Sequence, residues 1–190
     1  MSVTVQEKNH RFTVTEFLRM GETGIISPKA RVELLDGQII DMSPIGHFHG
    51  GIVARLVRLL NKVSRDRWLV WPQSSMSLNE FSEPQPDIIL LKPSNDDYTS
   101  HAPVADDVLL LIEVAESSLN FDRQIKLPLY GRAGIPEVWI VNLIDRVIEV
   151  YRDPNFTGYS STKTLHTGDK ASSQLFPDVV VDVAELLNTK

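Results

Sequence analysis

The sequence of 190 residues contains no cysteine. This absence excludes disulfide frameworks, thiolate zinc sites and cysteine nucleophiles together. Any bound metal ion would therefore be held by oxygen ligands, with or without histidine. Such a ligand set favours Mg²⁺ or Mn²⁺ over structural zinc.

Long apolar runs are missing as well. No run approaches the roughly 20 residues that span a membrane, and the polar residues 1–10 lack the apolar centre of a signal peptide. We therefore expect a cytoplasmic protein without a membrane partner.

The sequence also lacks an excess of positive charge. The formal net charge is −6, which provides no overall attraction to nucleic acid, because phosphate binding depends on lysine and arginine. Charge alone argues mildly against a stand-alone DNA-binding protein. It leaves open an enzyme whose acidic groups hold cations, or a dimer with a local basic surface.

The composition that is present fits one globular domain. Hydrophobic residues make up 42% of the chain and charged residues 23%, as in soluble folded proteins. A chain of this length can bury roughly 70% of its unfolded surface. We expect a single domain with its core over about residues 12–185.

Two acidic residues lie in stretches that are otherwise apolar, Asp87 in the run 86–91 and Glu113 in the run 108–115. Both runs are rich in leucine, isoleucine and valine and are bounded by turn formers, which is typical of central strands covered on both faces. Burying an unpaired carboxylate there costs several kcal/mol. A divalent metal ion bound by both carboxylates is the simplest compensation.

The order of the remaining elements predicts a mixed α/β fold. Helical periodicity and capping residues indicate helices over 12–20, 49–65 and from 117–120 onwards, the last shortened or kinked by Pro128. Alternation and turn formers indicate strands over 68–71, 75–78, 138–141 and 147–151, with edge elements over 159–165 and 179–183 and a helical turn over 184–187.

The dipeptide Asp36-Gly37 between two apolar stretches predicts an N-terminal hairpin over 31–42. Glu33 then lies on one arm of the hairpin. It is either a polar residue of a half-exposed strand or a third carboxylate for a metal cluster.

Strand geometry brings the candidate ligands together. If the strands carrying Asp87 and Glu113 are neighbours, both carboxylates can hold one ion, with the Val114 carbonyl as a further oxygen ligand. Lys126, on the helix that follows, can then orient or deprotonate a metal-activated water. Its ordinary explanation is a solvated helix pair with Asp122, four residues earlier.

These residues resemble a nuclease pattern. Pro86-Asp87, about 25 residues and then Glu113 at the end of an apolar strand are similar to the Pro-Asp…Asp/Glu-x-Lys pattern of restriction-endonuclease-like folds, although Ala115 stands where that pattern has lysine. More specifically, the chain resembles the Uma-two family of proposed bacterial endonucleases, earlier filed as a domain of unknown function. The resemblance follows family order through Glu33-Leu34-Leu35-Asp36-Gly37, Met42-Ser43-Pro44, His49, Pro86-Asp87, Glu113-Val114, Asp122 with Lys126 and Tyr130, and the run 134–141.

The resemblance implies a restriction-endonuclease-like mixed β-sheet flanked by helices and a phosphodiester substrate, with DNA favoured. It also implies that the lysine has moved to the following helix, which supports Lys126. At the matching family position, His49 would reach a phosphate or a metal-bound water, whereas a helix cap is its ordinary explanation. Gln73, a polar residue expected on a strand near the site, is a second candidate for substrate binding. Tyr130 and Trp139 are assigned to packing.

The leading interpretation is a Mg²⁺- or Mn²⁺-dependent endonuclease with Asp87, Glu113, Glu33 and Lys126 as catalytic residues. A homodimer is expected, because cuts in two opposite strands require paired sites. One alternative is a non-catalytic module on a nuclease scaffold that binds nucleic acid or protein. Another is a metal-dependent hydrolase of small phosphoesters. The basic residues of the helix over 49–65 are expected to form a solvated face rather than a phosphate-binding stripe.

Overall fold

The computed structural model of the protein describes residues 9–188. Most of the polar segment 1–10 therefore lies outside the described residues. Within residues 9–188, no helix combines the length and the apolar character needed to cross a bilayer.

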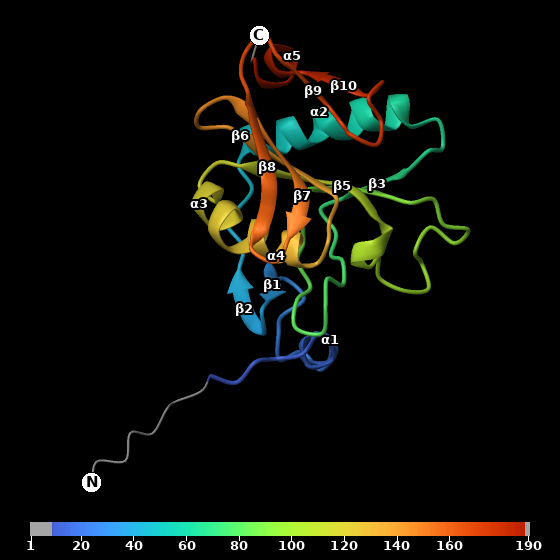
Figure 1. Ribbon diagram of the computed structural model, residues 1–190. Helices are drawn as coiled ribbons and strands as arrows, with labels where there is room; N and C mark the ends of the chain where they lie inside the picture. Colours follow the sequence, from blue (N-terminus) through green and yellow to red (C-terminus); the bar gives the residue numbers. More distant parts are fainter. Residues whose placement is uncertain (1–8, 189–190) are drawn as a thin grey trace.

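A six-stranded mixed sheet forms the centre of the molecule (Figure 1). Its only parallel pairing joins β5 to β6, and the other neighbouring strands are antiparallel. The parallel pair needs a crossover, which is the helical segment 119–132. In spatial order the strands are β3 (Leu69–Pro72), β4 (Ile88–Leu91), β5 (Val108–Ala115), β6 (Glu137–Asn142), β7 (Val147–Asn155) and β8 (Gly158–Leu165).

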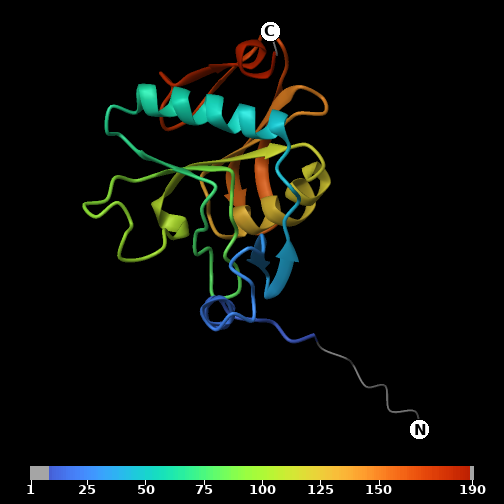
Figure 2. The same ribbon diagram turned by 180° about the vertical axis from the view of Figure 1, so that it is seen from behind.

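Each face of the sheet has its own apolar layer. Helix α2 (His47–Ser64) runs across one face, as Figure 2 shows, and packs Ile52 and Leu56 against Ile88 and Leu110. On the opposite face, the crossover helix packs against alternate residues of the same strands. Covering on both faces explains why β4 and β5 are apolar along both faces, with Glu113 of β5 as the exception.

The crossover helix contains one wide turn. It consists of α3 (Leu119–Phe121), the π-helical segment η2 (Asp122–Lys126) and α4 (Leu127–Arg132), and the Leu127 N–H bonds to the Asp122 carbonyl five residues back. Pro128 has no N–H, and its ring would clash with the carbonyl four residues earlier in a regular helix. The helix continues past Pro128 because the turn before it is wider.

The N-terminal hairpin is confirmed. Strands β1 (Val32–Leu35) and β2 (Gln38–Asp41) pair directly, and the turn residues Asp36 and Gly37 both have positive φ, as a type I′ turn requires. Helix α1 (Val14–Glu22) precedes it, with Thr13 and Glu16 forming a capping box.

The C-terminal part lies over α2. Strands β9 (Lys170–Ser172) and β10 (Val180–Asp182) form a separate two-stranded sheet, followed by α5 (Val183–Leu187). A single 3₁₀ turn, η1 (Ala105–Asp107), leads into β5.

The mixed sheet, the flanking helices and the hairpin are confirmed, but several local predictions are wrong. Residues 75–78 form no strand; they make only an isolated bridge through Ser77 to Val104. Helix α2 begins at His47, so His49 lies in its first turn and not before it. Asp87 and Gln73, both expected on strands, lie one residue before β4 and one residue after β3 respectively.

Candidate functional site

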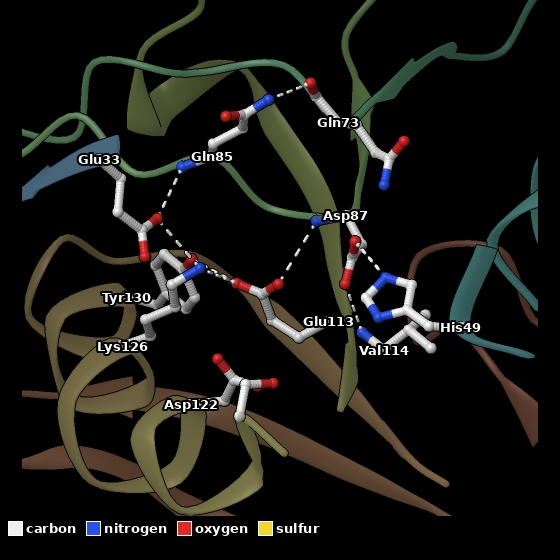
Figure 3. Close-up of polar contacts among 11 residues, drawn as sticks. Glu33, His49, Gln73, Gln85, Asp87, Glu113, Val114, Asp122, Lys126 and Tyr130 are labelled. Atoms are coloured by element: carbon white, nitrogen blue, oxygen red, sulfur yellow. Dashed lines mark hydrogen bonds and ion pairs between the residues drawn. The ribbon is translucent and has the colours of Figure 1, made fainter. Parts of the chain in front are cut away.

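A single cavity of about 260 Å³ collects most of the candidate residues. Its walls are the hairpin and the linker after it, the first turn of α2, the end of β5 and the crossover helix (Figure 3). The polar residues at or near its floor are Glu33, His49, Gln85, Asp87, Glu113, Asp122 and Lys126.

Asp87 and Glu113 are direct neighbours across two strands. Ile88 pairs with Ile112 in the antiparallel ladder, which places the preceding Asp87 opposite Glu113. The Asp87 N–H donates to Glu113 Oε2 at 3.3 Å, and the Val114 N–H donates to Asp87 Oδ2 at 2.8 Å. The expected juxtaposition of the two strands is therefore present.

Lys126 bridges the two glutamates of the cavity. Its Nζ lies 3.1 Å from Glu33 Oε2 and 3.2 Å from Glu113 Oε1, and all three side chains are almost fully buried. The Gln85 N–H donates to Glu33 at 3.1 Å. The Tyr130 hydroxyl donates to Glu113 Oε1 at 2.7 Å. Tyr130, assigned to packing from the sequence, thus also has a polar role.

Asp122 is a cavity residue that sequence reasoning missed. Its side chain is buried and accepts a hydrogen bond from Ser118 Oγ at 2.7 Å. The ordinary explanation of Asp122 and Lys126 as a solvated helix pair is wrong, because the crossover helix turns this face towards the sheet. The spacing of Asp122, Lys126 and Tyr130 at every fourth residue was the available signal.

His49, in the first turn of α2, contacts Asp87. Its Nε2 lies 2.8 Å from Asp87 Oδ1, and both side chains are mostly buried. This hydrogen bond is the main reason that the pKa of His49 is raised above its ordinary value, in spite of the opposing effect of burial.

Gln73 is placed next to the site by its backbone. Its N–H donates to the Asp87 carbonyl at 2.9 Å, and its own carbonyl accepts the side chain of Gln85. The residue has a φ of 45°, and its side chain does not line the cavity. Gln73 therefore supports the loop that carries Asp87, and substrate contact stays a prediction.

Negative charge is in excess in the cavity. Apart from the exposed Arg31, Asp41 and Glu116, four carboxylates, those of Glu33, Asp87, Glu113 and Asp122, face one lysine and one histidine. Burial raises the pKa of Glu113 to about 8, although Lys126 opposes the shift. Burial also raises the pKa of Asp122.

Burial acts on the pKa of Lys126 in the opposite direction, because the charged form of lysine is the protonated one. Burial lowers its pKa, but the surrounding carboxylates outweigh burial, and the net pKa of Lys126 is above its ordinary value. The lysine therefore stays charged at neutral pH. The positive charge of Lys126 is shared by two glutamates and does not balance the whole cluster.

The donor chemistry of this cavity fits a hard divalent cation. Mg²⁺ and Mn²⁺ prefer carboxylate and carbonyl oxygens, and the charge excess would favour a cation between Asp87 and Glu113. Within residues 9–188, no three His, Asp or Glu side chains are already arranged to hold a metal ion. Ligation would require the two carboxylates to give up part of their hydrogen bonding to His49, Lys126 and Tyr130.

The basic residues of α2 lie away from this cavity. Arg55, Arg58 and Lys62 line a different groove, between α2 and the C-terminal segment 180–186. Arg55 donates to the carbonyls of Leu186 and Asn188. These contacts join α2 to the C-terminal segment, and the solvated character of this face stays a prediction.

Comparison with known proteins places this geometry in a family. A search of curated proteins gave no match. Among solved structures, the chain is similar to one described as a "putative nuclease belonging to DUF820" from Anabaena variabilis ATCC 29413. The TM-score is 0.73 at 16% identity, with 93% of this chain and 97% of that chain covered. At this identity the likeness shows the fold, a nuclease-like mixed sheet.

The family model Uma2, described as "Putative restriction endonuclease", matches residues 14–184. The family description supports a nuclease, and the fold agrees with it. The match spans nearly all of the described residues, and the protein therefore belongs to the Uma2 family.

Proposed function

We propose that the protein is an endonuclease that hydrolyses phosphodiester bonds of nucleic acid with Mg²⁺ or Mn²⁺. The observation that carries this proposal is the buried excess of carboxylates beside one charged lysine. A structural cluster would pair each acid with a cation, because an unpaired buried charge is costly. A cluster that leaves acids unpaired is suited to holding a cation during function.

In this proposal Asp87, Glu113 and the Val114 carbonyl hold the metal, and Glu33 assists from the side of Lys126. The bound ion would lower the pKa of a water molecule and stabilise the charge that develops during in-line attack. The Val114 N–H holds Asp87 Oδ2, and Oδ1 would become available to the ion when its contact with His49 is released.

Lys126 would position the attacking water and stabilise negative charge on the phosphate. Its raised pKa argues against proton abstraction, because a base must be unprotonated at the working pH. Glu33 and Glu113 hold the ammonium group from two sides. His49 would contact a phosphate from the first turn of α2, and Gln73 would support the loop carrying Asp87.

Cleavage assays with Lys126→Met test the proposal. The folded full-length protein should cut nucleic acid with Mn²⁺ or Mg²⁺, and Lys126→Met should lower the rate by at least about a hundredfold. Lys163→Met, which removes an exposed lysine of β8, is the matched control and should keep full activity. Absence of cleavage by the folded wild type on DNA and RNA of every form would overturn the proposal.

A non-catalytic binding module is the second candidate. It is favoured by one observation, that the cavity carboxylates already have protein hydrogen-bond donors. Titration of Mn²⁺ by calorimetry separates the two functions. The endonuclease should bind Mn²⁺ and lose this binding in Asp87→Ala, whereas a binding module should show no heat of Mn²⁺ binding in either protein.

A further inference from the structure

The shape of the cavity points to the class of nucleic acid that it accepts. We infer that the substrate is a single strand that enters the cavity one nucleotide at a time, and not the interior of an intact duplex. This inference rests on the proposed function and adds the substrate class. It applies equally to DNA and RNA, whose phosphodiester chemistry is shared.

The first argument is depth. Glu33, Glu113 and Lys126 are each no more than 5% exposed. Cleavage requires the phosphodiester to reach Lys126 and a cation held by these glutamates. Duplex DNA is stiff over about 150 base pairs, so it cannot readily bend one of its outer phosphodiesters into a recessed site. A single strand has no such barrier, because its backbone bends freely.

The second argument is size. The cavity volume of about 260 Å³ is below the range of about 300–1,000 Å³ that is usual for pockets of small ligands. Such a space suits one nucleotide unit and excludes two paired strands. Enzymes that act on a base accept a single flipped-out nucleotide in a pocket of this kind.

The third argument is the chemistry of the walls. Part of the cavity lining is apolar, and consists of Ile40, Met42, Pro44 and Ile45 from the hairpin and its linker and Phe121 from the crossover helix. A carboxylate floor beside an apolar and aromatic wall matches the two halves of a nucleotide, its phosphate and its base. Stacking of bases on aromatic side chains is the sequence-tolerant means by which proteins hold single strands.

The fourth argument is charge at the rim. Arg31 is the cation there, and the exposed acids Asp41 and Glu116 oppose it. Binding along a duplex relies on many lysine and arginine contacts to phosphates. The basic residues of α2 line a different groove. The rim is therefore poorly suited to grip a duplex along its length, whereas one nucleotide that enters the cavity can contact Phe121 and a cation held by the carboxylates.

The test compares four substrates of one sequence with the full-length protein and Mn²⁺. These are single-stranded DNA, single-stranded RNA, blunt duplex DNA and a duplex with a single-stranded tail. Single strands and the tail should be cut at least about tenfold faster than the paired region. Equal cleavage of the duplex interior would overturn the inference and leave the endonuclease proposal standing. If no substrate is cut, the proposed function falls, and the inference falls with it.

Two wall variants test the stacking contact. Phe121→Ala should raise the KM for the single strand about tenfold with little change in kcat. Phe156→Ala is the matched control, because Phe156 is 84% exposed in the turn between β7 and β8, at the opposite end of the sheet. Ile45→Ser removes an exposed part of the wall, and serves if Phe121→Ala does not fold. An unchanged KM in a folded wall variant would overturn the inference.

Discussion

Two groups of buried acids in this protein differ in how they are balanced. One is the cavity group, formed by Glu33, Asp87, Glu113 and Asp122. The other is the strand group, formed by Glu137 on β6 and Glu149 on β7. Both groups lie in largely buried surroundings, and the glutamates of both groups are polar residues in strands.

In the strand group every carboxylate has a guanidinium. Glu137 accepts from Arg152, the Trp139 indole, Ser173 and the Gln174 N–H. Glu149 accepts from Arg123, Asn142 and Tyr151. Burial opposes ionisation of Glu149, but these donors outweigh it, and the pKa of Glu149 is below its ordinary value.

In the cavity group the nearby cations are too few to stabilise every carboxylate. The pKa of Glu113 and that of Asp122 are raised, because the local cations do not offset burial and mutual repulsion. Burial of an acid alone therefore does not distinguish structure from function. The pKa of Glu149 is lowered because its donors stabilise the charge, whereas the raised pKa values of Glu113 and Asp122 agree with the proposal of a cation site.

The largest expected effect comes from the cavity group. Glu113→Gln keeps the shape of the side chain and leaves Lys126 paired with Glu33, so we expect normal folding. Cleavage with Mn²⁺ should fall by at least about a thousandfold, because the metal loses an anionic ligand. Steady-state kinetics and circular dichroism measure the two properties. Retention of more than about a tenth of the activity would show that Glu113 is not an essential ligand of the metal.

The next largest effect is expected in the strand group, where a substitution should lower stability and leave activity unchanged. Glu137→Ala leaves Arg152 and several buried donors without an acceptor, and should lower the free energy of unfolding by about 3 kcal/mol. Urea denaturation measures this change. At temperatures where the variant is folded, its cleavage rate per folded molecule should match the wild type. A lower cleavage rate per folded molecule would contradict the purely structural role of Glu137.

The pH dependence should also separate the groups. The pKa of Glu113 is raised from 4.5 to about 8 by burial, so its stabilising contribution is complete below pH 4.5 and is lost as the pH rises through 8. The raised pKa of His49 acts in the same direction. The free energy of unfolding should fall across this range, and Glu113→Gln should flatten the slope.

Mn²⁺ binding should show the opposite trend with pH. The metal requires the ionised carboxylate, so its affinity should rise about tenfold per pH unit below the pKa of Glu113. Calorimetry at several pH values measures this slope. A pH-independent affinity would mean that Glu113 does not release a proton on binding.

The smallest effect is expected for Asp122→Asn. This change removes one of several repelling charges and keeps a hydrogen-bonding group for Ser118. The free energy of unfolding should stay the same or rise, by less than about 1 kcal/mol. Glu149→Gln, the equivalent change in the strand group, should lower it. Urea titrations measure both changes. If both variants shift the free energy of unfolding in the same direction, the two groups do not differ in their charge balance.

Much of this site could be predicted from the sequence, because its information is local. Asp87 and Glu113 stand out against apolar neighbours, and strand alternation places them on one face. Asp36-Gly37 specifies the turn of the hairpin that carries Glu33. Lys126 follows from spacing together with the family resemblance, although its ordinary explanation pointed to solvent.

The remaining features depend on tertiary packing. The burial of Asp122 is decided by how the crossover helix lies on the sheet, and an isolated helix face does not show this. The Tyr130 hydroxyl reaches Glu113 for the same reason. Residues 75–78 alternate like a strand but lie against separated segments, so no continuous partner is present for pairing. The bounds of short strands shift by one residue, which moved Asp87 and Gln73 into loops.

The wide turn before Pro128 makes the site sensitive to the number of residues in the chain as well as to their identity. Losing one residue between Asp122 and Lys126 would remove the residue that widens this turn, and the turn would close to a regular helical one. The ring of Pro128 would then clash with the carbonyl four residues before it, and the helix would bend or break beside the cavity. In this segment a one-residue deletion should therefore damage the site more than most conservative substitutions, and homologues that share the site should vary in sequence here before they vary in length.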